Sequence, residues 1–551
     1  MNNNANRQIA RAAGTVMFAI LFGQLAGLAR GILVANTFGA SLELDAFFAA
    51  NRVSETLFLL VAGGALGSAF IPTFAGLLAK DEKDSAWRLA SSLANAVTLS
   101  LSLLAALIAL FAPQVVRYAL APGLSTDPEL FSLTVALLRI QLISAVLFGL
   151  GGLIVGVLNA HQVFLIPALT PALYQLGIIF GAIFLAPSMG IYGLAWGVVI
   201  GAVFYLLVQL PSLIKLINPL RPAGTSPKST INTNDNYSNS PSWIWGRLGG
   251  GLNLKDANVR QVLLLMLPRL LGVAVVQLNF WVNTNLASRM DEGSVTSLTY
   301  GFSLMLMAQA AIAQSVAIAA MPTFSAQHAL GKMDEMRASL AASLRGILLM
   351  ALPASVGLII LREPLISFLY QRGKFDEQDV QLTAWALLWF AAGLVGHSIM
   401  EVLTRAFHAQ QDTKTPVIIG TIAMGLNVIF SFWFSNLFAQ IGWLSLGGLA
   451  LANSLATALE ATALFIFMRK RLNGIEGKSI ADGAWRVTLS ALGMAIGLLL
   501  WIQATGSLMR WIVALGGVAI GGVIYLAGVV ILKVPEIKLL TNAVSNRIKR
   551  A

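Results

Sequence analysis

Residues 27–79, GLARGILVANTFGASLELDAFFAANRVSETLFLLVAGGALGSAFIPTFAGLLA, decide how the chain folds. The stretch is apolar enough to lie in a bilayer, yet it carries four charged side chains, Arg30, Asp45, Arg52 and Glu55. Charges at membrane depth are costly, so they usually face a protein interior or a water-filled cavity and are candidate functional residues. The stretch therefore predicts membrane helices that enclose polar side chains.

Part of this stretch recurs in the second half of the chain. Residues 71–96, IPTFAGLLAKDEKDSAWRLASSLANA, are echoed by residues 321–346, MPTFSAQHALGKMDEMRASLAASLRG. A second pair, NAHQVFLIP at 159–167 and HAQQDTKTP at 408–416, has nearly the same separation. Two matches at nearly one separation predict a duplicated helical unit.

The composition indicates a polytopic membrane protein. The chain has 551 residues, of which 57% are hydrophobic and 11% charged, far more apolar than an average soluble protein. Apolar runs long enough to span a bilayer follow one another almost to the C-terminus, and they predict an all-α fold of fourteen transmembrane helices. The N-terminus lacks a cleavable small-residue site, so its first apolar run is expected to remain as the first helix. Cysteine is absent, which excludes disulfides and thiolate chemistry.

The duplication predicts two pseudo-symmetric six-helix lobes and an additional C-terminal pair of helices. Residues 1–217 are expected to form the first lobe and residues 257–471 the second, while residues 472–551 hold the additional pair and a basic cytoplasmic tail. Between the lobes, residues 218–256 include RPAGTSPKSTINTNDNYSNSPS, which has the composition of a flexible linker.

The net charge of +12 has a topological explanation. Lys and Arg concentrate at the N-terminus, in the linker, in the tail and after the second, eighth and twelfth predicted helices, which all fall on one side. The opposite loops are nearly free of basic residues, except residues 362–379, where acids balance the bases. The positive-inside rule then places both termini and the linker on the cytoplasmic side of an inner (plasma) membrane. The basic excess is thereby explained without a nucleic-acid partner, and none is expected.

The charges of the opening stretch are candidate substrate-binding residues. Asp45 and Arg52 are seven apart and share a helix face, while Arg52 and Glu55 are neighbours three apart. One alternative is that these opposite charges neutralise one another and only fix how the helices pack. Because Arg30 lies on the preceding helix as well, the set favours the wall of a polar cavity.

Two later polar groups extend the candidate site. Gln277 and Asn283 lie in LPRLLGVAVVQLNFWVNTNLASR, residues 267–289, where their amides could line a passage or bond to neighbouring helices. We include both as candidate substrate-binding residues.

A polar stripe on one later helix predicts a gate. His397, Glu401, Arg405 and His408 lie within a narrow arc, but the two histidines are too far apart to share one metal ion, so no metal site is expected. A Glu401–Arg405 pair is expected at the cytoplasmic mouth, with His397 on the same stripe. The chain has no Walker loop, paired catalytic acids, nucleophile elbow or zinc spacing, so we do not expect an enzyme.

Several segments carry a family resemblance. They are FGASLELDAFFAANRV, GGALGSAFIPTF, LPRLLGVAVVQLN, and LREPLISFLYQRGKFDEQDVQLTAWAL followed by RAFHAQQDTKTPV. Together they resemble the MurJ/MviN-type lipid II flippases of the multidrug/oligosaccharidyl-lipid/polysaccharide exporter superfamily, over nearly the whole chain.

The resemblance implies two lobes around a central cavity and a C-terminal groove for a polyprenyl tail. It implies that a polyprenyl-pyrophosphate-linked peptidoglycan precursor is moved from the cytoplasmic to the outer leaflet by alternating access, for cell-wall biogenesis and cell shape. It implies no cofactor, leaves coupling to the membrane potential or a monovalent ion open, and makes cell-wall synthesis proteins candidate partners.

The chain departs from the family pattern at the site. Arg30 and Asp45 match charged positions of the family, whereas other positions that are commonly charged there carry neutral residues here: Gln24, Phe58 or Leu59, Gly63, Ser303 and Asn283, the last where many members have an aspartate linked to sodium binding. Two alternatives therefore stay open: a flippase for another polyprenyl-linked saccharide or a drug/cation antiporter of the same superfamily, and a non-transporting membrane scaffold for wall synthesis.

Overall fold

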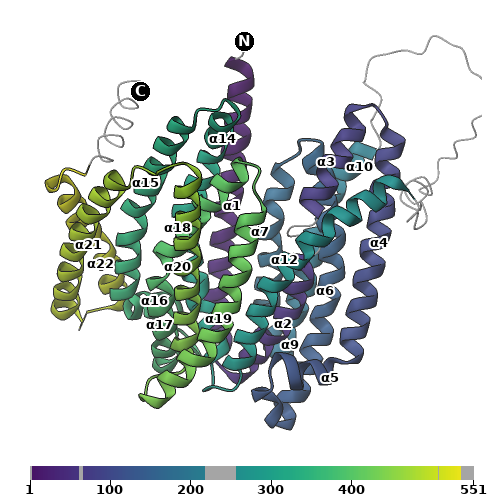
Figure 1. Cartoon of the computed structure of the whole chain (residues 1–551). Coiled ribbons are helices and arrows are strands. Elements are labelled where there is room, and N and C mark those ends of the chain that lie inside the picture. Colours follow the sequence, from purple (N-terminus) through teal and green to yellow (C-terminus); the bar gives the residue numbers. More distant parts are fainter. Residues whose placement is uncertain (1–2, 61–65, 218–255, 507, 535–551) are drawn as a thin grey trace, which may run out of the picture. The chain divides into compact units, whose positions relative to one another are not determined.

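The computed structural model describes residues 3–60, 66–217, 256–506 and 508–534, and every regular element in these ranges is a helix (Figure 1). Ten of the described helices are long and apolar enough to cross a membrane, or eleven if α17 (Glu377–Ala392) and α18 (Leu394–Ala409), which meet at 45°, form one span. The all-α polytopic fold expected from the apolar runs is confirmed. The count of fourteen spans is compatible with these helices and stays a prediction.

The chain divides into two compact units. The first comprises Met1–Leu33, Ala49–Tyr118 and Asp127–Gln277, and the second comprises the remaining residues. The division passes through three α-helices, α1 (Asn3–Phe38), α2 (Leu42–Leu60) and α12 (Ala257–Ala287), and through the short π-helix η2 (Val115–Leu120), each of which contributes to both units. It therefore does not coincide with the lobe boundary predicted at residues 256 and 257, which stays a prediction, and the predicted linker lies mostly outside the described residues.

The first unit also contains a set of apolar helices that pack on one another: α3 (Leu66–Ala79), α4 (Lys83–Leu110), α6 (Pro128–Ala160), α7 (Leu165–Phe180), α9 (Ile191–Leu207) and α10 (Leu210–Ile217). Its core is built around Phe70 and Phe74, both fully buried. Helices α7 and α9 cross closely, because a Cβ on Gly177 would overlap the backbone of Gly201. Small residues at such crossings let membrane helices pack backbone to backbone.

The second unit holds the later helices: α13 (Ser294–Gln309), α14 (Ser315–Ala329), α15 (Met333–Ile360), α16 (Arg362–Tyr370), α17, α18, α19 (Lys414–Gln440), α20 (Leu446–Arg471), α21 (Gly477–Thr505) and α22 (Arg510–Ile531). The C-terminal pair packs on α15, through a buried cluster that includes Leu349, Leu498 and Tyr525. The Tyr525 hydroxyl donates to the Leu349 carbonyl at 2.5 Å.

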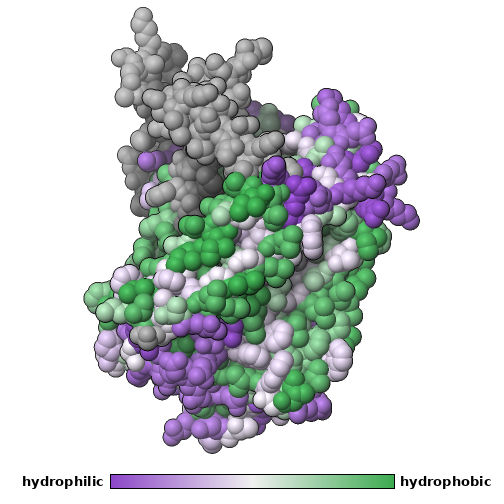
Figure 2. All heavy atoms as spheres, turned by 90° about the vertical axis from the view of Figure 1, so that its left-hand side faces the viewer, coloured by the Kyte–Doolittle hydropathy of each residue, from purple (hydrophilic) through white to green (hydrophobic). Residues whose placement is uncertain are grey.

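The outer face of the C-terminal pair is suited to lipid. Leu500 and Ile496 of α21 and Leu526 and Val530 of α22 are each about 60% exposed. Figure 2 shows this face of the molecule, where apolar residues form a broad area and hydrophilic residues gather toward its ends. An exposed apolar surface of this extent on spanning helices is expected where they contact acyl chains.

Candidate functional site

Three predicted site residues come together in the first unit. Arg52 Nη1 lies 2.9 Å from Glu55 Oε2, with side chains 20% and 44% exposed. Thr56 Oγ1 donates to the Arg52 carbonyl at 2.7 Å and lies within hydrogen-bonding distance of Gln277 Oε1, at 3.3 Å, so the end of α2 contacts α12. Gln277 is buried. Thr56, which the sequence did not single out, is therefore the residue that joins the predicted charges to the predicted amide.

Arg30 extends this cluster onto α1 and α7. It is half-buried, and its charge and that of Glu55 both act on the hydroxyl of Tyr174, on α7. One turn before Arg30, Gly27 faces Gln175, whose Nε2 would lie 3.7 Å from a Cβ at that position. The Oε1 atom of Gln175 is buried and accepts no hydrogen bond from a described residue. We call Arg30, Arg52, Glu55, Thr56, Tyr174, Gln175 and Gln277 the polar cluster.

The polar cluster has the chemistry of an anion site. Arg52 forms an ion pair with Glu55, whereas Arg30 forms no ion pair with a described residue. A guanidinium stays protonated and presents donors in a planar fork, which suits the paired oxygens of a phosphate. Tyr174 and the two glutamines add neutral groups that can donate to an oxygen or accept from a sugar hydroxyl.

Asp45 has a structural position in the second unit. Its carboxylate accepts from the backbone N–H of Gly293 at 3.0 Å, from that of Thr296 at 2.7 Å and from Thr296 Oγ1 at 2.6 Å, and the residue is 2% exposed. These donors lie at the start of α13, so Asp45 caps that helix from a distant part of the chain. This geometry corrects the placement expected from the sequence: Asp45 occupies a capping position and not an open cavity wall.

Asn283 belongs to a network of amides and hydroxyls that joins α12 to α19. Its Nδ2 donates to Asn279 Oδ1 at 3.3 Å, and its Oδ1 accepts from Ser431 at 2.9 Å. Ser431 Oγ also lies 3.0 Å from Asn427 Oδ1, and Asn279 Nδ2 donates to the Met424 carbonyl at 3.2 Å. Of the two roles that the sequence left open for Asn283, bonding to a neighbouring helix is the one that this geometry supports.

The stripe on α18 separates into two parts. Arg405 donates through Nε and Nη2 to Glu401 Oε1, at 3.2 and 3.0 Å, which is the pair expected from the sequence. His397 is buried, and its Nε2 lies 3.1 Å from Asn453 Oδ1 of α20. His397 thus fixes the packing of two helices, whereas the Glu401–Arg405 pair is partly exposed. Among the described residues, no group of three or more metal-ligating side chains is close enough to hold an ion.

Glu460 is a buried acid that the sequence argument missed. It lies within α20, is 8% exposed, and forms no ion pair with a described residue. Its Oε1 would lie 3.1 Å from a Cβ at Gly420 of α19, so the absence of a side chain there makes room for the carboxyl group. Its signal in the sequence is a single acid inside the apolar run ATALEATALF.

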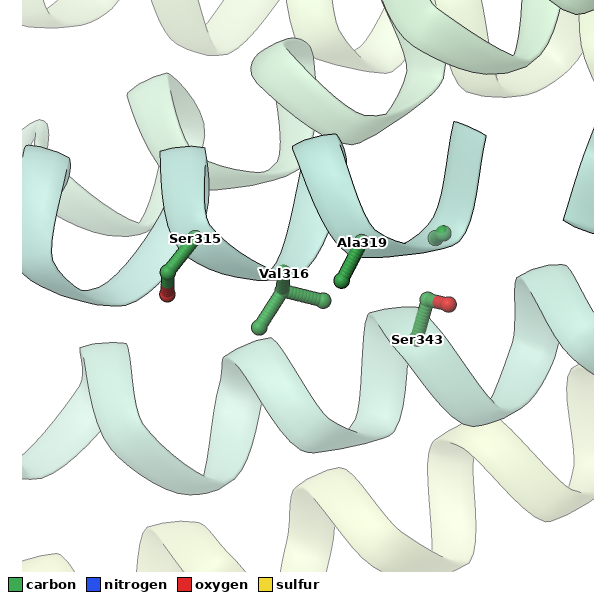
Figure 3. Close-up of a pocket in the computed structure, with 5 residues that line it drawn as sticks. Ser315, Val316, Ala319 and Ser343 are labelled. Carbon is green, nitrogen blue, oxygen red and sulfur yellow. The ribbon is translucent and has the colours of Figure 1, made fainter. Parts of the chain in front are cut away.

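A pocket of about 410 Å³ between α14 and α15 offers no comparable chemistry (Figure 3). Val316 and Ala319 line it together with two serines. The hydroxyl of Ser315 donates to the Ala311 carbonyl at 2.8 Å, and that of Ser343 to the Ser339 carbonyl at 2.9 Å. Both hydroxyls thus bond to carbonyls three or four residues before them, and no charged residue of the described ranges lines the pocket. The polar cluster remains the stronger candidate.

An all-α polytopic protein in which arginines, a carboxylate and amides gather on α1, α2, α7 and α12 has the character of a membrane transporter. The family described as "Lipid II flippase MurJ" matches residues 34–515. A protein of Burkholderia cenocepacia named "Lipid II flippase MurJ" is 32% identical over 470 residues, which cover 84% of each chain. The chain belongs to the lipid II flippase MurJ family, a family of bacterial multi-pass membrane proteins.

Solved structures agree with this assignment. The structure titled "Lipid II flippase MurJ, inward closed conformation" has a TM-score of 0.74 at 26% identity, and the match covers 95% of this chain and 99% of that one. An inward-facing multidrug resistance MATE family transporter of the MOP superfamily has a TM-score of 0.63 at 16% identity, covering 84% and 98%. The second likeness shows a shared fold only.

Proposed function

We propose that this protein moves lipid II from the cytoplasmic to the outer leaflet of the bacterial inner membrane during peptidoglycan synthesis. Membership of the MurJ family supports the substrate class, and one observation in the molecule carries the proposal. The polar cluster presents Arg30 on α1 and Arg52 on α2, together with neutral hydrogen-bonding groups. A pyrophosphate linked to sugars needs both kinds of partner.

The energetics explain why such a cluster is required. The hydrocarbon core is about 30 Å thick, and a pyrophosphate-sugar head group left without partners in it pays a large desolvation cost. Arginine offsets this cost because it can bind phosphate oxygens through two parallel hydrogen bonds. In this mechanism the pyrophosphate binds Arg30, and Arg52 exchanges part of its interaction with Glu55 for the ligand. Alternating access then exposes the head group to the other side.

The direction of transport depends on topology, which the charge distribution supports. In the second unit, Lys332 and Arg337 lie around the start of α15, and Arg469, Lys470 and Arg471 end α20. Arg471 Nη1 pairs with Asp412 Oδ2 at 2.6 Å, which brings the end of α20 against the turn before α19. We place these basic ends, and both termini, on the cytoplasmic side.

The proposal includes no catalytic step and no cofactor. Coupling to the membrane potential or to a monovalent ion, and contact with cell-wall synthesis proteins, stay predictions. The alternatives are transport of another polyprenyl-linked saccharide, drug/cation antiport, and a scaffold without transport.

One experiment separates these alternatives. A bacterial strain is depleted of its own lipid II flippase, this chain is expressed in it, and lipid II in the outer leaflet is labelled from outside. We expect growth to be restored and outer-leaflet lipid II to return. Rescue without labelled lipid II would support a scaffold. Failure of both, with the protein inserted at normal levels, would contradict the proposal and favour another substrate.

A further inference from the structure

A second pocket lies at one end of the second unit, beside the C-terminal pair of helices. It has a volume of about 390 Å³ and lies among the turn from α15 to α16, the start of α17, the end of α21 and the start of α22. Leu499 and Ile502 of α21 contribute to its apolar wall. Four charged residues also line it, two arginines and two glutamates: Arg362, Glu363, Glu377 and Arg510.

The charges in this pocket are loosely paired. Arg362 Nη2 lies 3.4 Å from Glu363 Oε1, and Arg510 Nη2 lies 3.8 Å from Glu377 Oε2. Tight charge-assisted hydrogen bonds are about 2.7–2.9 Å long. Both glutamates and Arg510 are more than half exposed, so each ion pair contributes little. Two shorter hydrogen bonds hold these side chains: Arg362 Nη1 donates to the Ile359 carbonyl at 2.8 Å, and Glu377 Oε2 accepts from Gln371 Nε2 at 2.7 Å.

Two helix N-termini add a preference for an anion. α16 begins at Arg362 and α22 begins at Arg510, and neither has a side-chain hydrogen bond to its cap. α17 begins beside the same pocket, but Asp376 and Asp379 form a capping box there. The N-terminus of a helix carries partial positive charge, which favours a phosphate, and α16 and α22 each have an arginine at the first position.

We infer that this pocket binds the head group of a zwitterionic glycerophospholipid that carries a phosphate and a primary ammonium, as phosphatidylethanolamine does. The phosphate lies between Arg362 and Arg510, and the ammonium donates to Glu363 and Glu377. An acyl chain follows Leu499 and Ile502 along α21. This site is separate from the polar cluster and does not depend on the transport of lipid II.

The balance of charges in the pocket favours this class of lipid over anionic and choline phospholipids. The described lining residues include two arginines and two glutamates, whose charges balance, so a purely anionic head group would leave both carboxylates facing a negative charge. A choline head group keeps the positive charge but has no N–H donor for the glutamates. A primary ammonium has three donors, which makes phosphatidylethanolamine the best match.

The test uses the full-length protein in detergent with added lipids. Retention of phosphatidylethanolamine, phosphatidylcholine and phosphatidylglycerol is measured by native mass spectrometry. The pair Glu363→Gln with Glu377→Gln should remove the preference for phosphatidylethanolamine over phosphatidylcholine, which we expect to be about tenfold in the unsubstituted protein. The pair Arg362→Gln with Arg510→Gln should lower retention of all three lipids.

Arg372→Gln is the matched control, because Arg372 is an arginine near the start of α17 that does not line the pocket. It should leave all three affinities unchanged. If the double arginine variant does not fold, Arg362→Lys with Arg510→Lys keeps the charge and should still weaken binding. Equal retention of phosphatidylethanolamine and phosphatidylcholine by the unsubstituted protein would overturn the inference. So would a control that loses lipid as the double arginine variant does.

Discussion

The capping role of Asp45 makes a prediction that separates packing from substrate binding. In Asp45→Ala, two backbone N–H groups and the Thr296 hydroxyl lose their acceptor at a buried position. Loss of a helix cap costs about 1 kcal/mol, and each buried donor left unsatisfied costs about 1–3 kcal/mol. The substitution also removes the unfavourable desolvation of a buried carboxylate, which offsets part of this loss of stability. We therefore expect the free energy of unfolding to fall by about 3 kcal/mol.

Asp45→Asn keeps one oxygen that can still accept from Thr296, while its amide group meets the N–H of Gly293 as donor against donor. We expect a smaller loss, about 1–2 kcal/mol. Glu43→Ala is the matched control, because Glu43 is an exposed acid in the same first turn of α2. Its effect should stay within about 0.5 kcal/mol.

Reversible unfolding in mixed micelles measures these differences, and lipid II turnover per folded molecule is measured on the same preparations. The capping role predicts a loss of stability with turnover close to that of the unsubstituted protein. Unchanged stability with abolished turnover in Asp45→Ala would refute it and would return Asp45 to the substrate site.

Two further predictions concern acids of the second unit. Glu460→Gln should insert normally and be at least as stable as the unsubstituted protein in thermal unfolding. A neutral amide of the same shape replaces a buried carboxyl group that has no ion partner among the described residues. A marked loss of stability would indicate that the carboxylate is paired in the folded protein. Outside the spans, burial alone would raise the pKa of Asp412, but hydrogen bonds from Thr415 and Arg471 outweigh it and lower the pKa from 3.8 to about 2. Because the pKa of Asp412 is lower in the folded state, its stabilising effect is present above the unfolded-state pKa and is lost as pH falls from about 4 to about 2. The difference in stability between the unsubstituted protein and Asp412→Asn should therefore disappear over that pH range. A difference independent of pH would contradict the Asp412–Arg471 pair.

The fold class was accessible from the sequence because the bilayer imposes simple rules. Long apolar runs specify helices when no water is present to satisfy the backbone, and the described helices follow those runs. The Arg52–Glu55 and Glu401–Arg405 pairs were accessible for a similar reason: both are local, three or four residues apart on one helix.

The residues that were misplaced or missed depend on contacts between distant segments. The partners of Asp45 lie 248 and 251 residues away, and no local pattern shows that they reach it. Thr56 is a neutral residue that also bonds to its own helix, so only the position of Gln277 reveals its second contact. Glu460 shows in the sequence only as a single acid in an apolar run, and its place beside Gly420 of the neighbouring helix depends on how α19 and α20 pack.

Turnover of lipid II by Arg30→Ala tests the central claim most directly. Arg30 is the cluster's guanidinium without an ion pair among the described residues, so the claim requires it to bind the pyrophosphate. At matched expression and confirmed insertion, turnover should fall about a hundredfold, the equivalent of about 3 kcal/mol. Turnover by Arg30→Lys should lie between that of Arg30→Ala and that of the unsubstituted protein, because lysine keeps the charge and loses the planar fork. Turnover at the unsubstituted rate in Arg30→Ala would show that the anion site lies elsewhere.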